Sequence, residues 1–207
     1  MIIPKRAGDL AALLRNRRSV RTYQDRLIER ALLEQMVEAA RWAPSPHGRQ
    51  PWRFAVLTQH KPKQQLAEQM GETWRANLQM DGQSEETVNI RLEKSYRRIL
   101  QAPAIIIPCL YLEDLDHYPD QTRQANEVTM AIQSLGAAIQ NMLLMAYDLG
   151  LDTGWMCAPL FCPEVACVAL NLDKQLIPHA LITVGYATAD PVRRPRLPLD
   201  RLIVHFD

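Results

Sequence analysis

The 207-residue sequence is poor in cysteine, and this excludes a fold built on disulfides. Its four cysteines are scattered, and no two of them form a C-x-x-C pair. Such spacing matches neither a disulfide framework nor a structural zinc site. Cys157, Cys162 and Cys167 are therefore expected to be small, buried apolar residues.

Familiar catalytic motifs are also missing. The sequence has no G-x-S-x-G elbow, no H-E-x-x-H zinc motif, no P-loop and no G-x-G-x-x-G turn. No Ser or Cys stands beside a His in a way that suggests a catalytic triad. We expect neither a metal site nor a catalytic side chain.

Positive and negative charges are nearly balanced along the chain. Lys and Arg number 24 against 23 Asp and Glu, which gives a net charge of +1. A protein devoted as a whole to nucleic acid or to anionic membranes is excluded, although a local basic patch is not. With 47% apolar and 23% charged residues, the composition is that of one globular domain over residues 1–207.

One apolar stretch is long enough to span a bilayer. Residues 128–147 carry no charge, but they include five polar side chains that a lipid-facing helix would bear at a cost. The first residues lack an apolar run of signal-peptide length. We therefore expect a soluble, cytoplasmic protein that has no membrane partner.

Hydrophobic periodicity and breaker residues predict a mixture of helices and strands. Helices are expected near 9–16, 29–42, 61–81, 84–100, 122–149 and after Pro163, and strands at 52–58, 104–110 and 177–186. The strand at 104–110 is apolar throughout, which suits burial on both faces. The helix at 122–149 has one stripe of polar residues between apolar faces, so it suits the centre of a domain or of a dimer.

Two basic clusters lie at opposite ends of the sequence. Arg17, Arg18 and Arg21 flank Ser19, while Arg193, Arg194 and Arg196 lie near the C-terminus. Guanidinium groups suit phosphate geometry. Each cluster is either a solvated surface patch or part of one phosphate site, and the sequence leaves both open.

The order of several motifs resembles the FMN-dependent nitroreductase family. RRSVRTY at 17–23 is followed by AARWAPS at 39–45 and QPWRF at 50–54, which is similar to the family's N-terminal signature. GLDTGW at 150–155 resembles its flavin-facing turn, and LITVGY at 181–186 its last core strand.

Two details are similar to a subgroup of that family. APSPH at 43–47 and LFCPE at 160–164 resemble the flavin domain fused to the glutamate ligase that completes the deazaflavin coenzyme. The chain has no room for the ligase part, so the resemblance implies a free-standing version.

The resemblance implies an α+β fold with a mainly antiparallel sheet flanked by helices. It also implies an intertwined homodimer with FMN in its interface. The C-terminal tail, about 187–207, would then wrap around the partner subunit.

Site residues are carried over by position. Arg17, Ser19 and Arg21 would contact FMN, with Arg18 beside them, and Arg194 would close the phosphate site, with Arg193 or Arg196 as alternatives. Other contacts carried over are Ser45, Pro46 and His47 from the partner subunit, and the backbone of Met156, Cys157 and Ala158 near the flavin N5. Many members have Asn where this chain has Gly48, and Gln50 or Arg49 could compensate.

The implied function is FMN-dependent NAD(P)H oxidoreduction, in which flavin N5 carries the chemistry. NADH or NADPH would be the donor, and a nitroaromatic, quinone or other small conjugated molecule the acceptor. A stand-alone reductase of a deazaflavin-coenzyme precursor is the narrower alternative. A second alternative is a non-catalytic flavin carrier or redox sensor with the same fold. If the resemblance is set aside, the basic clusters predict a module that binds anions or nucleic acid. We expect no nucleic-acid partner.

The segment 61–120 would shape the acceptor pocket. Its side chains include Trp74, Arg75, Arg91, Arg97 and Arg98, which could meet an anionic substrate. They could equally be exposed helix faces with charge pairs four residues apart.

Overall fold

The structure is a computed structural model that describes residues 9–192 and 194–207. Its centre is an antiparallel sheet in the order β1-β2-β5-β3, with β4 also paired to β2. The strands are β1 (Trp52–Leu57), β2 (Ala104–Tyr111), β3 (Asp152–Met156), β4 (Leu176–Pro178) and β5 (Leu181–Gly185). The chain thus has the α+β architecture with a mainly antiparallel sheet that the family resemblance implies.

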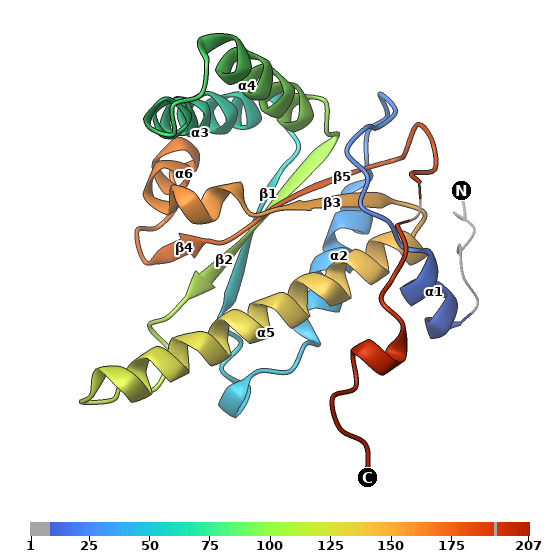
Figure 1. Cartoon of the computed structure of the whole chain (residues 1–207), viewed down its shortest axis with the longest axis vertical. Helices are drawn as coiled ribbons and strands as arrows, with labels where there is room; N and C mark the ends of the chain where they lie inside the picture. The colour runs from blue at the N-terminus through green and yellow to red at the C-terminus, as the bar shows by residue number, and fades with distance from the viewer. Residues whose placement is uncertain (1–8, 193) are drawn as a thin grey trace.

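Helices cover both faces of this sheet (Figure 1). They are α1 (Leu10–Asn16), α2 (Arg30–Arg41), α3 (His60–Met80), α4 (Glu85–Leu100), α5 (Gln121–Asp148) and α6 (Pro163–Leu170). Helices α2 and α5 pack with one hydrophobic cluster, while α3, α4 and α6 contribute to the other. Three short turns of 3-10 helix are η1 (Pro46–Gly48), η2 (Ala158–Phe161) and η3 (Leu199–Arg201).

Strand β2 joins the two hydrophobic clusters. Ile106 enters the cluster of α2 and α5, while Ile105 and Ile107 enter the other cluster, and all three are fully buried. Alternation along a strand sends successive side chains to opposite faces. The predicted burial of this strand on both faces is confirmed.

Helix α5 is long and apolar enough to cross a membrane by length and composition, but 39% of its most apolar window is buried inside the protein. Ala138 and Met142 at its centre have no exposed surface. It is therefore a core helix in this fold. Glu127 near its start is also buried, and neither carboxylate oxygen has a hydrogen-bond partner among the described residues.

Three expectations from the sequence are wrong. The single strand expected at 177–186 is two strands, because the chain leaves the sheet after Pro178 and resumes at Leu181. The stretch expected as a turn at 150–155 contains β3, which pairs with β5 along its whole length. Cys157 is exposed, whereas Cys162 and Cys167 are buried as expected.

Candidate functional site

The basic segment at 17–21 is fixed against strand β3. Ser19 forms a parallel bridge with Thr153, and the Val20 N–H donates to the Thr153 carbonyl at 2.8 Å. A Cβ at Gly154 would lie 2.4 Å from the Val20 carbonyl oxygen and 2.8 Å from Thr183 Oγ1. Only glycine therefore allows the segment to lie this close to the strand.

Tyr23 anchors the end of the same segment. Its hydroxyl lies 2.6 Å from the Val20 carbonyl oxygen and 2.7 Å from Thr183 Oγ1. Burial raises the pKa of the Tyr23 phenol above its usual range. The hydroxyl therefore stays protonated and holds the segment between β3 and β5.

The two basic clusters converge in space. Arg17 is partly buried, and its pKa is lowered first by that burial and then by the charges of Arg196 and Arg18. Arg196 comes from the C-terminal tail, so residues from the two ends of the sequence act on one another. Gathered cations with a depressed pKa are typical of a site prepared for an anion.

The remaining predicted arginines are placed as follows. Arg21 Nη2 donates to the Trp155 carbonyl at 3.5 Å, at the end of β3. Arg18 Nη1 donates to the carbonyls of Arg15 and Arg17. Arg194 is exposed, and Arg193 lies outside the described residues.

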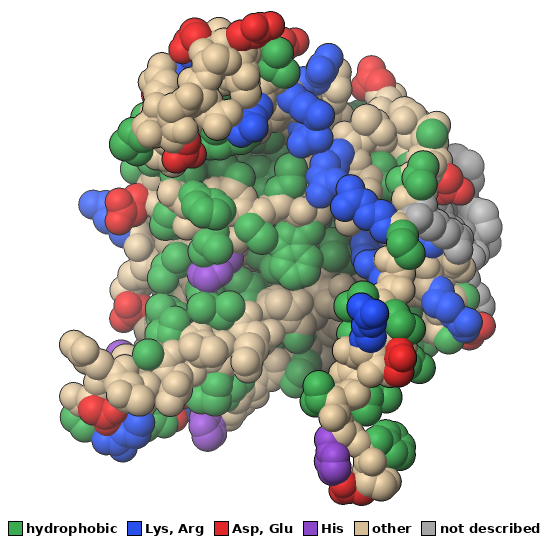
Figure 2. Space-filling view, in the orientation of Figure 1, with side chains coloured by type: hydrophobic (Ala, Val, Ile, Leu, Met, Phe, Trp, Pro, Cys, Tyr) green, Lys and Arg blue, Asp and Glu red, His purple; other side chains and the backbone are tan. Residues whose placement is uncertain are grey.

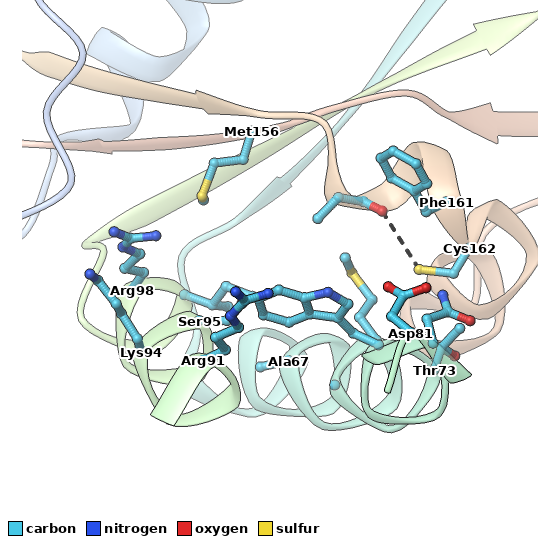
Figure 3. Close-up of a pocket in the computed structure, with 16 residues that line it drawn as sticks. Ala67, Thr73, Asp81, Arg91, Lys94, Ser95, Arg98, Met156, Phe161 and Cys162 are labelled. Carbon is cyan, nitrogen blue, oxygen red and sulfur yellow. Dashed lines mark hydrogen bonds between the residues drawn. The ribbon is translucent and has the colours of Figure 1, made fainter. Parts of the chain in front are cut away.

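A cavity of about 690 Å³ is lined in part by Arg98, which is affected by the charge of Arg21. It lies between α3 and α4 on one side and the chain from Met156 to Cys162 on the other (Figure 3). Met156 and Ala158, both predicted site residues, line it, whereas Cys157 between them does not. Trp74 from α3 adds an aromatic surface.

The α4 side of the cavity is cationic. Arg91, Lys94 and Arg98 line it, and Figure 3 shows Lys94 and Arg98 at the end nearest Met156. The pKa of Arg98 is lowered by burial and by the charge of Arg21. Figure 2 shows Lys and Arg side chains in a line across this face, from the side of α4 towards the C-terminal tail.

The predicted loop at 45–50 lies elsewhere on the chain. Its 3-10 turn η1 lies beside α5, on the far side from α3 and α4 (Figure 1). Gln50 N–H donates to Ser45 Oγ at 3.1 Å, and Arg49 forms an ion pair with Asp116. Ser45, Gly48 and Gln50 share a hollow of about 320 Å³ with Trp42.

Backbone geometry marks this loop as unusual. His47 and Gln50 have φ of 51° and Gly48 has φ of 66°. Non-glycine residues rarely adopt positive φ, and such outliers gather at functional sites. The predicted site residues therefore fall into two groups within one chain: the arginine segment with β3 and the tail, and the 45–50 loop.

Sequence reasoning missed two residues of the site, Gly154 on β3 and Lys94 on α4. Gly154 carried a signal, since a glycine inside a strand often marks a close backbone approach. Lys94 carried none, because its place on the cavity depends on how α4 packs. Among the described residues, no group of three or more His, Cys, Asp or Glu could hold a metal ion.

Comparison with known families matches residues 14–186 to the family described as "Nitroreductase family". A relative from Methanothermobacter thermautotrophicus is 24% identical over 196 residues, which is 94% of this chain and 85% of the relative. This relative is provisionally named as an NADH dehydrogenase/NAD(P)H nitroreductase.

Solved structures share the fold over almost the whole chain. A provisionally named nitroreductase from Desulfovibrio desulfuricans, solved in complex with FMN, is 25% identical with a TM-score of 0.75, and 97% of this chain and 98% of that chain are covered. A BluB-like flavoprotein from Clostridium difficile is 20% identical with a TM-score of 0.81, over 97% of this chain and all of the other.

Proposed function

Because the chain belongs to the nitroreductase family, we propose that it is an FMN-dependent NAD(P)H oxidoreductase that passes electrons to small conjugated acceptors. Nitroaromatics and quinones are the acceptor classes proposed. The names of its relatives support the nicotinamide donor, and the FMN complex of a similar structure supports the cofactor. The observation that carries the proposal is the convergence of Arg17, Arg18 and Arg196, together with a cavity that has an aromatic wall and whose lining residue Arg98 is affected by the charge of Arg21.

The residues present fit FMN. Arg17 and Arg196 supply charge for a phosphate, and Ser19 lies on the same segment between Arg17 and Arg21. We assign Arg17, Arg18, Ser19 and Arg196 to the phosphate and ribityl chain, and Arg21 to the pyrimidine edge. Arg194 remains an alternative for the phosphate.

The chemistry itself belongs to the cofactor. When bound, FMN supplies the redox step by accepting a hydride at N5 and passing electrons to a second substrate. The strand that Arg21 contacts ends at Met156, and the backbone of residues 156–158 would border the reacting edge. Fixed cations such as Arg21 stabilise negative charge that develops nearby, without moving during the reaction.

We further propose that a second copy of the chain completes the site. The 45–50 loop lies apart from the arginine segment in one chain, so Ser45, Pro46, His47 and Gln50 would serve the site of the other copy. The tail supports an intertwined homodimer, because its apolar side chains are exposed. They are Val192, Leu197, Leu199, Leu202, Ile203, Val204 and Phe206.

FMN binding tests the proposal directly. The purified protein should carry FMN and oxidise NADH or NADPH in the presence of a nitroaromatic or quinone. The double variant Arg17→Ala/Arg21→Ala should bind FMN at least about 100-fold more weakly, since each charged hydrogen bond contributes about 1.5–3 kcal/mol. The measurement is a titration of apoprotein followed by flavin fluorescence.

A matched control removes two arginines that the site does not use. Arg30 pairs with Glu34, and Arg75 pairs with Glu85, both at exposed positions. Arg30→Ala/Arg75→Ala should keep wild-type FMN affinity. Wild-type affinity in the Arg17→Ala/Arg21→Ala variant would overturn the site assignment.

A further inference from the structure

Helix α4 presents a row of cations to the cavity. Arg91, Lys94 and Arg98 are three, four and seven residues apart, which puts them on one face of a helix. All three line the cavity, and none forms an ion pair or side-chain hydrogen bond with another residue in the described part of the chain. By contrast, Arg75 on the neighbouring helix is bound by Glu85 and Asn89.

These cations exceed what one cofactor phosphate needs. Arg17, Arg18 and Arg196 already form a group of like charges around the phosphate position proposed above. Arg98 is affected by the charge of Arg21, whereas the row continues along α4 to Arg91, away from that group. A cavity wall that carries one sign of charge attracts oppositely charged molecules, here anions.

The rest of the cavity is suited to a flat, apolar molecule. Met70 and Trp74 from α3 and Met156 from β3 line it, together with Phe161 from η2. Asp81 also lines it, but Figure 3 shows this carboxylate at the opposite end from Lys94 and Arg98. In that view Arg91 lies between the two ends, so the cavity combines apolar side chains with a cationic α4 side and one acidic end.

We propose that Arg91, Lys94 and Arg98 form an anion subsite that selects reacting molecules that carry a carboxylate or phosphate in addition to a planar conjugated group. The inference rests on the proposed function, since the planar group would react with the bound flavin. Two sources can supply this chemistry. One is an acidic electron acceptor, and the other is the phosphate that distinguishes NADPH from NADH.

The acceptor arm uses a matched pair of substrates, 4-nitrobenzoate and 4-nitrobenzamide, which differ mainly in charge. Wild-type protein loaded with FMN should have the higher kcat/KM for the anion. The ratio of the two kcat/KM values should fall about tenfold in Arg91→Gln/Lys94→Gln, because two charge-assisted contacts are lost. It should also shrink as salt rises, since the Debye length falls from about 10 Å at 0.1 M to about 3 Å at 1 M.

Arg97→Gln provides the control. Arg97 is on the same helix, is exposed and does not line the cavity, so its loss lowers the net charge by one, half the change in Arg91→Gln/Lys94→Gln, without touching the subsite. The ratio should stay at its wild-type value in this variant. Binding is checked without turnover by titrating 4-nitrobenzoate against the flavin absorption spectrum, where Arg91→Gln/Lys94→Gln should raise the Kd and Arg97→Gln should not.

The donor arm measures anaerobic flavin reduction by NADPH and by NADH. If the subsite receives the donor's phosphate, the NADPH to NADH ratio of reduction rates falls in Arg91→Gln/Lys94→Gln, and the acceptor ratio does not. A fall in either ratio supports the anion subsite and identifies its source. Unchanged ratios in both arms, in a flavin-loaded and active protein, overturn the subsite alone, whereas a protein that neither binds FMN nor oxidises NAD(P)H overturns the proposed function.

Discussion

Replacing Gly154 with alanine tests whether the close contact between β3 and residues 19–21 builds the candidate site. The added Cβ would lie 2.4 Å from the Val20 carbonyl oxygen, 2.8 Å from Thr183 Oγ1 and 3.0 Å from Arg21 Cγ. Two of these neighbours cannot withdraw easily, because one is backbone and the other is held by the Tyr23 hydroxyl at 2.7 Å. The segment that carries Arg21 must therefore move away from the strand.

The cost follows from what this movement breaks. Overpacking a well-filled site costs about 1–3 kcal/mol. Loss of the 2.8 Å hydrogen bond from Val20 N–H to the Thr153 carbonyl adds about 1 kcal/mol. We expect Gly154→Ala to lower the free energy of unfolding by about 2–4 kcal/mol and the Tm by about 4–16 °C.

Differential scanning calorimetry and FMN titration measure the two effects. FMN affinity should fall as well, although every proposed phosphate-binding side chain is still present. Gly71→Ala in α3 is the control for stability, because its added Cβ meets nothing within 4 Å. It should raise the unfolding free energy by about 0.5–1 kcal/mol. A Gly154→Ala protein with the Tm and FMN affinity of the wild type would refute the reasoning.

Two other predictions concern assembly and pH. Ile132 on α5 is 43% exposed, so Ile132→Glu should leave one chain folded. The charge should prevent the proposed dimer from forming, so the variant should sediment as a monomer and lose FMN. A variant that sediments as a dimer would contradict this. Burial lowers the pKa of His179, so the folded state resists its protonation and the unfolded state does not. Unfolding free energy should therefore fall as pH drops through about 6.5. In denaturant titrations His179→Gln should lose less stability over that range, and equal pH dependence would count against it.

Local patterns predicted the helices well. Each expected helix is present, with ends within about two residues. An apolar face, where the sequence has one, indicates which side of the helix packs against the core. Strand β3 was missed because DTGWM mixes polar residues with glycine, and only its pairing with β5 makes it a strand. Pro178 was an overlooked signal for the break after β4, since proline is poorly suited to the interior of a sheet.

For the site, too, the sequence does not show which residues far apart in the chain come into contact. The arginine clusters could be recognised from the sequence, but the contact between Arg17 and the tail depends on the tertiary fold. The sequence did not decide whether four arginines of segment 61–120 face the acceptor pocket or are exposed on helix faces. Arg91 and Arg98 line the cavity, whereas Arg75 is paired with Glu85 and Arg97 does not line the cavity. The polar stripe of α5 also does not show which apolar positions one chain covers by itself, and Ala138 is completely buried within one chain. A charge there would unfold the protein rather than test its assembly.

The separation of the site residues into two groups has a genetic consequence. In the proposed dimer, each site takes its arginine segment from one chain and its 45–50 loop from the other. A chain damaged in the first group and a chain damaged in the second would each be inactive alone. Expressed together, half of the randomly mixed dimers would pair the two kinds of chain and hold one intact site and one doubly damaged site. Two defective alleles would thus complement each other in the same cell, and each mixed dimer would work at half capacity.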